Sequence, residues 1–215
     1  MKRLRALAVA VGLALGAQGF GAQSLGAQEI ARVPAELANA AARFERGAVL
    51  GNPQGDVTIV EFFDYNCPYC RAADDDLHRL IAADKQVKLV LVQYAVLGPS
   101  SIEAARVALA VARLKPDAFP AFHKRLFARR GRIDAAAALA AAAPTGLDRS
   151  AVVKEADSAE TTAALKAAAR LGANLGLNAT PSYIVLTDSI LGHPGLAKLK
   201  DIVTSVRTCE KTSCP

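Results

Sequence analysis

A strand pattern leads directly into a pair of cysteines and then into a helix pattern. The run Val57–Phe63 is rich in β-branched and aromatic residues, which predicts a buried strand. Cys67-Pro68-Tyr69-Cys70 follows it, and residues 72–83 have the spacing of a helix. A second strand pattern spans 87–94. A strand, a helix and a strand in this order predict a parallel pair with a right-handed crossover, and therefore an α/β fold.

The position of the two cysteines predicts their chemistry. Cys67 falls at the start of the predicted helix, where unpaired backbone N–H groups and the helix dipole stabilise an anion. A thiolate at this position has a lowered pKa and can attack a disulfide. Cys70, one turn further on, can then release the mixed disulfide. The pair therefore predicts thiol–disulfide exchange.

Other roles for Cys67 and Cys70 fit the sequence less well. A structural zinc site needs four ligands, but the only other cysteines are Cys209 and Cys214, and the three histidines are scattered, so no metal site is predicted. A purely structural disulfide between Cys67 and Cys70 would close a very small loop and stabilise little. An alternative of another class is a copper-binding or copper-stress protein that uses the same thiolates. The chain has a single methionine and no histidine-rich stretch to support it.

The N-terminus has the pattern of a cleavable signal peptide. Lys2, Arg3 and Arg5 precede an apolar run at 6–17, and small residues continue to about residue 27. Removing 1–27 removes three basic and no acidic residues, which lowers the formal net charge from +6 to +3. This mild charge predicts no nucleic-acid partner, and the absence of another long apolar run predicts a protein that is not embedded in the membrane. The expected location is the bacterial periplasm, where disulfides persist.

The remaining sequence predicts one domain with an insertion. Residues 28–50 are expected to form a short N-terminal helical extension, with a helix that starts near Pro34. Residues 51–208 are expected to form the main domain, followed by a tail at 209–215. About 100–175 is helical by pattern, so it is expected to interrupt the sheet as a helical insertion.

Local signals predict the element boundaries within and after the insertion. Ser100 and Glu103 have the spacing of a capping box, and Asp148 is a candidate N-cap. The expected elements are helices at 104–114, 116–127, 133–143 and 160–175, strands at 181–186 and 190–191, and a closing helix at 194–206.

Three segments together resemble the DsbA family of thioredoxin-fold oxidoreductases: Glu61–Cys70, Leu97–Ser101 and Ala179–Tyr183. Within that family the chain is most similar to the Com1-like and ScsC-like branch, which shares Phe-Phe-Asp-Tyr-Asn-Cys-Pro-Tyr-Cys. The resemblance covers nearly the whole chain after residue 27. It implies a thioredoxin-like fold with a helical insertion, and disulfide exchange with exported protein substrates. It also implies no cofactor, and a membrane redox partner of the DsbB-like or the DsbD/ScsB-like type.

The resemblance implies roles for residues outside the cysteine pair. Thr180-Pro181 matches a cis-proline loop that faces the pair and presents its backbone to a substrate strand. Glu61 matches a buried acid that accepts the proton of the second thiol. Pro68 and Tyr69 are implied to contact substrate, with Tyr69 facing solvent. The alternatives are that Pro181 merely begins a strand, and that Glu61 lies on the solvent side of an edge strand.

Two questions stay open from the sequence. Cys209 and Cys214 are expected to form a structural disulfide in an oxidising compartment, although a second redox-active pair is the alternative. The direction of electron flow is also open. Pro68-Tyr69 differs from the Pro-His of the best-known family oxidases, and Thr180 matches isomerase and reductase relatives. An oxidase and an isomerase or reductase therefore both fit. His78, on the predicted helix after the pair, is expected to be a surface residue.

Overall fold

A mixed β-sheet forms the centre of the fold in the computed structural model, which describes residues 30–44 and 46–215. The predicted signal peptide at 1–27 lies outside the described residues. The strands are β1 (Ile30–Arg32), β2 (Ala48–Gly51), β3 (Val57–Phe63), β4 (Val87–Gln93), β5 (Ser182–Val185) and β6 (Asp188–Leu191). They are ordered β1-β6-β5-β3-β4-β2. Only β3 and β4 are parallel among these pairs, so the predicted parallel pair and the α/β class are confirmed.

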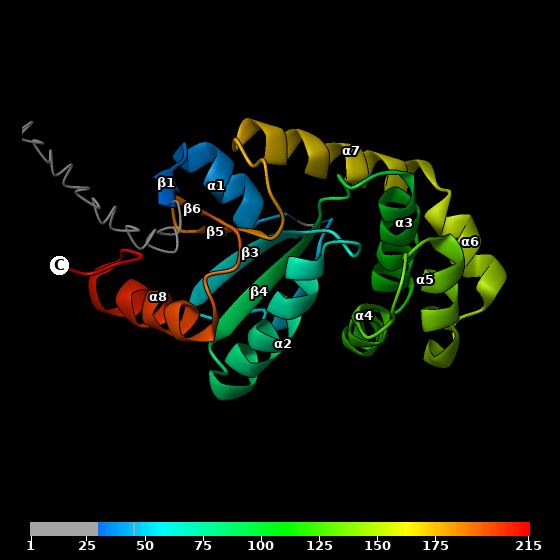
Figure 1. The fold of residues 1–215 in the computed structure, drawn as a ribbon, viewed down its shortest axis with the longest axis horizontal. Helices are drawn as coiled ribbons and strands as arrows, with labels where there is room; N and C mark the ends of the chain where they lie inside the picture. The colour runs from blue at the N-terminus through cyan, green and yellow to red at the C-terminus, as the bar shows by residue number, and fades with distance from the viewer. Residues whose placement is uncertain (1–29, 45) are drawn as a thin grey trace, which may run out of the picture.

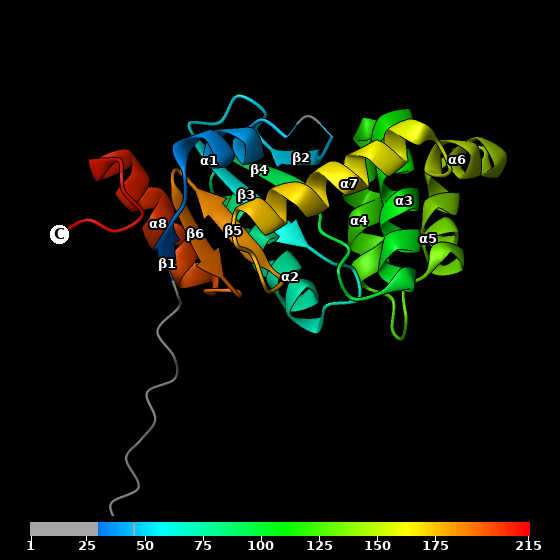
Figure 2. The same ribbon diagram turned by 90° about the horizontal axis from the view of Figure 1, so that it is seen from above.

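Helices cover both faces of the sheet and form a block at one end of it. The helices are α1 (Ala35–Ala42), α2 (Pro68–Ala83), α3 (Pro99–Leu114), α4 (Phe119–Phe127), α5 (Ala135–Ala142), α6 (Arg149–Ala156), α7 (Ala159–Asn174) and α8 (Leu196–Cys209), with short 3₁₀ turns at Pro116–Ala118 and Ala143–Thr145. Helices α2 and α8 lie on one face, and α1 and α7 lie on the other (Figures 1 and 2). Helices α3 to α6 form the block beside the sheet, which confirms the predicted helical insertion.

The central strand β3 is buried on both faces, because it lies between β5 and β4. Side chains alternate along a strand, so Val60 and Phe62 pack with the α1 and α7 face. Ile59 and Phe63 pack with the α2 and α8 face instead. Glu61 shares the side of Ile59 and Phe63. The strand period therefore places this carboxyl group beneath α2.

Two edge strands were not predicted from the sequence. The segment expected to be a helical extension contains α1 directly after Pro34, but it also supplies β1 and β2. Strand β1 pairs with β6 at one edge of the sheet, and β2 pairs with β4 at the other. Runs of three and four residues are too short to show a strand period, so their assignment depends on partners that are distant in sequence.

The predicted capping box at Ser100 and Glu103 is wrong. Helix α3 begins at Pro99, with Gly98 as its N-cap at a φ of 119°. Proline at the first helical position and a glycine with positive φ start the helix earlier than the polar signal does. The Glu103 carboxylate instead accepts a hydrogen bond from the Ala135 N–H at 3.3 Å. The predicted N-cap of α6 is confirmed by Asp148, whose side chain accepts from the Ala151 N–H.

A glycine of α7 allows close contact with the sheet. A Cβ atom at Gly172 would lie 2.4 Å from Cε2 of Tyr94, and the Tyr94 hydroxyl donates to the Leu177 carbonyl at 3.0 Å. The Tyr94 ring is held by its own backbone at one end and by this hydrogen bond at the other, so it cannot easily move away from an added methyl group. Gly172→Ala is therefore expected to lower the free energy of unfolding by about 2–3 kcal/mol, measured by urea denaturation. Ala163→Gly at an exposed position of α7 measures the helix-propensity effect separately. A more stable Gly172→Ala protein would mean that propensity outweighs the contact.

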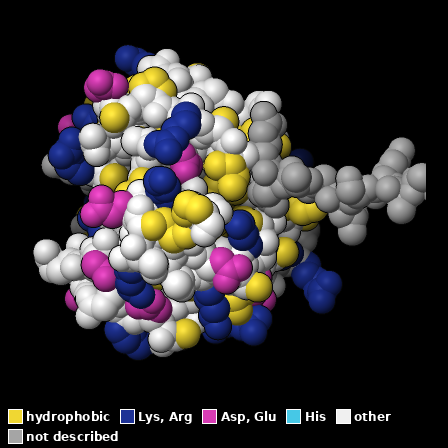
Figure 3. All heavy atoms as spheres, turned by 90° about the vertical axis from the view of Figure 1, so that its left-hand side faces the viewer, with side chains coloured by type: hydrophobic (Ala, Val, Ile, Leu, Met, Phe, Trp, Pro, Cys, Tyr) yellow, Lys and Arg dark blue, Asp and Glu magenta, His cyan; other side chains and the backbone are white. Residues whose placement is uncertain are grey.

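The face toward α8 carries mixed charges. Figure 3 shows Lys and Arg side chains interspersed with Asp and Glu among apolar groups on this side of the described residues, without one continuous basic area. Among the helices that the structure describes, none combines the length and the apolar character needed to cross a membrane.

Candidate active site

The turn between β3 and α2 is organised by Asp64. Its carboxylate accepts from the Asn66 N–H at 2.8 Å and from the Val96 and Leu97 N–H groups, both at 3.0 Å. Its carbonyl oxygen accepts from the Cys67 N–H at 3.0 Å. One acid therefore fixes the turn before the cysteine pair and holds the loop after β4 beside it. This role of Asp64 was not predicted from the sequence, although an Asp side chain that binds the backbone two residues further on is a common turn signal.

The two cysteines occupy the first turn of α2. Cys67 is the N-cap residue, Pro68 is at the first helical position, and Cys70 lies one turn in. Both thiols are free, with residue exposures of 4% for Cys67 and 0% for Cys70. Tyr69 is 70% exposed between them, so it is available to a molecule that approaches the pair.

The surroundings of the two thiols shift their pKa values in opposite directions. The pKa of Cys67 is lowered from its ordinary value of 9.0 to about 5, mainly by the hydrogen bond from the Cys70 thiol. The side-chain hydroxyl of Thr180 and the backbone N–H groups of Cys70 and Tyr69 lower it further. Burial acts against this shift but is outweighed. Burial raises the pKa of Cys70 far above its ordinary value, and its hydrogen bond to Cys67 adds to the rise. At neutral pH, Cys67 is the thiolate and Cys70 is the thiol.

The loop before β5 lies against Cys67. The Thr180–Pro181 peptide bond is cis, and the Thr180 carbonyl oxygen is 3.1 Å from the Cys67 sulfur. The Thr180 carbonyl oxygen can accept a hydrogen bond from the protonated thiol only, so it opposes ionisation of Cys67. The S–H, O–H and N–H donors around the sulfur favour the thiolate. Pro181 is buried and directly precedes β5. The loop brings together two of the predicted site residues with the thiolate.

Glu61 lies beneath the pair in the centre of the sheet. Its exposure is 2%, and β3 is an inner strand, so the alternative of a solvent-facing acid on an edge strand is wrong. Burial raises the pKa of Glu61 well above its ordinary value, and the charges of Asp74 and Cys67 raise it further. A carboxyl group of this kind exchanges a proton at a higher pH than an exposed one does.

A buried polar cluster that the sequence did not predict joins the helical block to α2. The Tyr65 hydroxyl is 2.8 Å from Nδ1 of His123, and Nε2 of the same ring is 3.0 Å from the Asp74 carboxylate. His78, expected on the surface, is half-buried with Nε2 at 3.5 Å from Asp74. These residues are far apart in the sequence, and nothing in their spacing indicates the contact.

Asn66, the residue before Cys67, binds the loop that precedes α5. Its side-chain amide donates to the Ile133 carbonyl and accepts from the Ile133 N–H, both at 2.8 Å, and it also donates to Ser101 Oγ at 3.1 Å. Two hydrogen bonds in opposite directions fix both the position and the orientation of this loop. The insertion therefore contacts the active-site turn directly.

The remaining cysteines lie at the other end of the fold. Cys209 and Cys214 are joined by a disulfide at the end of α8, whereas the first pair is at the start of α2 (Figure 1). In the part of the chain that the structure describes, no group of three or more His, Cys, Asp or Glu side chains is arranged to hold a metal ion.

Comparison with known proteins gives a consistent family. The family model described as "DSBA-like thioredoxin domain" matches residues 58–204. A thioredoxin-like oxidoreductase from Silicibacter pomeroyi DSS-3 is 39% identical with a TM-score of 0.72, over 77% of this chain and 96% of that one. The catalytic domain of Proteus mirabilis ScsC is 25% identical with a TM-score of 0.72, over 80% of this chain and 94% of that one.

A curated relative matches a shorter region. "Disulfide bond formation protein D" of Bacillus subtilis (strain 168) is 36% identical over 86 residues, which is 38% of this chain. The match spans only 39% of that relative's own length. The predicted family and the thioredoxin-like fold are confirmed by the family model and by the solved structures together.

Proposed function

Because this chain belongs to the DsbA-like thioredoxin-fold family of thiol–disulfide oxidoreductases, we propose that it exchanges disulfides with exported protein substrates in the periplasm through Cys67 and Cys70. The observation that carries this proposal is the pair of opposite pKa shifts at the start of α2. Cys67 has a pKa of about 5, and the pKa of buried Cys70 is raised. One thiol is therefore ready to attack, and the other is protected until it is needed.

The reaction follows from this pair. In the reducing direction, the Cys67 thiolate attacks one sulfur of a substrate disulfide, and the other substrate sulfur leaves as a thiolate that takes up a proton. Cys70 then loses its proton and attacks the Cys67 sulfur, which releases the second substrate thiolate. Two electrons pass from the cysteine pair to the substrate, and the pair becomes a disulfide. Oxidation of a substrate dithiol is the same sequence in reverse.

The surroundings of the pair suit an extended protein segment. Tyr69, Val96 and Leu97 are 70%, 50% and 52% exposed, and Asp64 holds the last two beside the turn before Cys67. Exposed apolar side chains bind unfolded segments without strict sequence preference. The backbone of Thr180, next to the Cys67 sulfur, supports pairing with a substrate strand.

Glu61 is proposed to accept the proton of Cys70 during resolution of the mixed disulfide. Glu61→Gln keeps the side-chain volume and removes the acid. Resolution is therefore expected to slow by roughly tenfold or more, since positioned acid–base groups typically contribute at least this factor. Rapid acid quenching of a preformed mixed disulfide measures the step. The alkylation rate of Cys67 is the control for the attacking thiol, and resolution at the wild-type rate would remove Glu61 from the mechanism.

The direction of electron flow is proposed to favour oxidation of substrates. Stabilising the Cys67 thiolate stabilises the reduced pair, and a couple with a stabilised reduced form is a stronger oxidant. Equilibration of Cys67–Cys70 with a series of glutathione buffers measures the reduction potential. A potential close to that of cytosolic reductants, about −270 mV, would support the reductase direction instead.

Location and partner are proposed from the N-terminal pattern and the family. Residues 1–27 have the basic and apolar regions of a signal peptide. An exported oxidase needs a partner to reoxidise it, and an isomerase or reductase needs one to reduce it. A membrane protein of the DsbB-like type fits the first case and one of the DsbD/ScsB-like type fits the second. N-terminal sequencing of the protein from a periplasmic extract tests cleavage.

A disulfide-transfer experiment tests the proposed activity. Oxidised protein is mixed with a reduced, unfolded protein that carries two cysteines, and the thiols of both are counted. Loss of two substrate thiols for each pair gained on Cys67 and Cys70 is expected. The variant Cys209→Ser/Cys214→Ser is expected to transfer equally well, because that disulfide lies at the other end of the fold. No transfer above a Cys67→Ser control would reject the proposal.

A further inference from the structure

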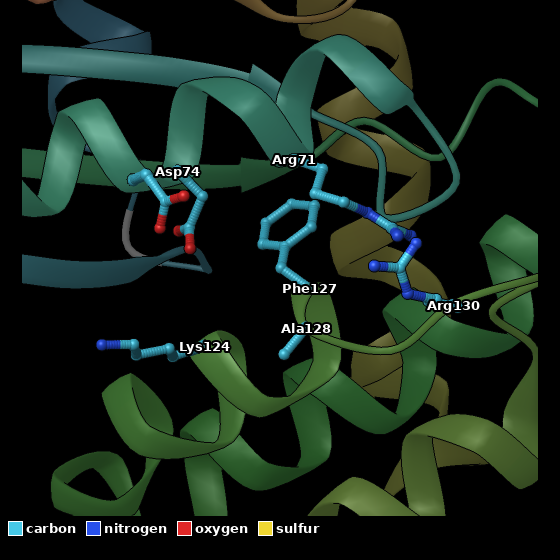
Figure 4. A pocket seen from close by; sticks show the side chains of 7 residues that line it. Arg71, Asp74, Lys124, Phe127, Ala128 and Arg130 are labelled. Carbon is cyan, nitrogen blue, oxygen red and sulfur yellow. The ribbon is translucent and has the colours of Figure 1, made fainter.

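A pocket with a polarised lining opens between α2 and the end of α4. Its volume is about 320 Å³, and it is lined by Arg71, Asp74, Asp75, Lys124, Phe127, Ala128 and Arg130. The acids come from α2, and most of the other groups come from α4 and the loop after it. Figure 4 shows Asp74 and Lys124 at one end of this pocket, and Arg71 and Arg130 at the opposite end.

The two arginines at that end point toward one another (Figure 4). Among the described residues, neither Arg71 nor Arg130 is in an ion pair. The Nε atom of Arg71 is also buried without a hydrogen-bond partner. Two like charges held together, one with a buried donor unused, favour an anion between them.

The nearby acids do not supply that anion. The Asp74 carboxylate is buried and lies 3.0 Å from Nε2 of His123. Asp75 is exposed and is in no ion pair with either arginine among the described residues. The arginine end therefore keeps its positive charge.

Both arginines belong to segments that are hydrogen-bonded to the turn of the reactive pair. Arg71 directly follows Cys70, and its N–H donates to the Cys67 carbonyl at 3.2 Å. Arg130 belongs to the loop that ends at Ile133, where the Asn66 side chain binds both backbone groups. Since Asn66 precedes Cys67, the loop that carries Arg130 is hydrogen-bonded to the residue next to the proposed nucleophile.

We propose that Arg71 and Arg130 form a binding site for an acidic side chain near the reactive cysteine of a protein substrate. Two planar guanidinium groups can each give two parallel N–H donors to a carboxylate, which a lysine cannot do. The apolar ring of Phe127 lines the same pocket and excludes water from one side of the contact. This inference rests on the proposed function and adds a substrate preference to it.

Matched peptides test the preference. Each peptide carries two cysteine thiols, with either Glu or Gln two residues from the first cysteine. Oxidised protein is used in excess, and loss of the peptide thiols is followed by acid quench and chromatography. The wild-type rate is expected to be roughly fivefold higher for the Glu peptide, as a partly exposed ion pair would give, and to lose this advantage in high salt. Arg130→Gln is expected to abolish the preference, so that the Glu and Gln peptides react at equal rates.

Arg149→Gln is the control for net charge. Arg149 is exposed at the start of α6, in the helical block. This variant lowers the charge by the same amount and is expected to keep the full preference for Glu. An equal loss in Arg149→Gln, a preference that survives Arg130→Gln, or equal wild-type rates for the two peptides would overturn the inference. Failure to oxidise either peptide would reject the proposed function instead.

Discussion

Cys70→Ser is expected to accumulate mixed disulfides with protein substrates, and Cys67→Ser is expected to accumulate none. Cys67, with a pKa of about 5, is proposed to form the bond to the substrate, and Cys70, which is fully buried, is proposed to resolve it. Turnover should fall by roughly a thousandfold or more in either variant, because removal of one essential group stops the whole sequence. Non-reducing electrophoresis after acid trapping measures the adducts.

Alkylation gives an independent measure of the same assignment. In Cys70→Ser, iodoacetamide should modify Cys67 faster at pH 6 than it modifies an ordinary cysteine, because the Thr180 side chain and the backbone N–H groups at positions 69 and 70 still favour the thiolate. Loss of the Cys70 thiol removes the largest contribution to the low pKa of Cys67, so some upward shift is expected in this variant. Cys67→Ser should leave a thiol that reacts slowly at pH 6. Adducts of equal yield in the two variants would contradict the assignment of roles.

The stability difference between reduced and oxidised protein is expected to change sign with pH. The pKa of Cys67 is about 5 in the folded reduced protein and 9.0 as its ordinary value. This lowered pKa stabilises the reduced fold fully above about pH 9, and the benefit is lost as the pH falls toward 5. Its size is about 1.4 kcal/mol for each pH unit in this window. At pH 8 the thiolate therefore contributes roughly 4 kcal/mol.

The Cys67–Cys70 disulfide stabilises the oxidised form, whereas the thiolate stabilises the reduced form. A closed loop of about four residues constrains the unfolded chain by roughly 2 kcal/mol at any pH. The reduced protein should be more stable by about 2 kcal/mol at pH 8, and the oxidised protein by about the same amount at pH 4.5. The raised pKa of Cys70 affects stability only above about pH 9. The rise in the Glu61 pKa is due mainly to burial, which both redox states share.

Urea denaturation of both redox forms between pH 4.5 and 8 measures this change. The experiment uses the Cys209→Ser/Cys214→Ser variant, because a reductant would also open that disulfide. A stability difference that is constant across this range would mean that Cys67 is not ionised differently in the folded and unfolded chains. An oxidised form that is more stable at pH 8 would contradict the low pKa of Cys67.

The parts of the fold that follow local rules could be predicted from the sequence. The strand before Cys67 and the start of α2 depend on neighbouring residues, so their patterns identified them. The burial of Glu61 was implied by family resemblance, and the alternation along β3 now explains it. The N-cap role of Asp148 was equally local.

Contacts between distant segments could not be predicted in the same way. The hydrogen bonds of Asn66 to Ile133 and the contact of His123 with Asp74 join elements whose relative position depends on packing of the whole insertion. No spacing rule connects such residues. The start of α3 was misplaced for another reason, since Gly98 and Pro99 gave a stronger boundary than the polar residues that follow them.

The edge strand β1 can pair only late in synthesis of the chain. Strand β1 comes from the first described residues, yet its partner β6 is at 188–191. A chain that emerges from its N-terminus must therefore carry β1 unpaired until almost all of it is available. During this interval β1 is unpaired and β3 lacks its β5 neighbour, and an unpaired strand edge is the part of a sheet most prone to pair with another chain. The sheet of this thiol–disulfide oxidoreductase is therefore complete only when β6, its last strand, is available.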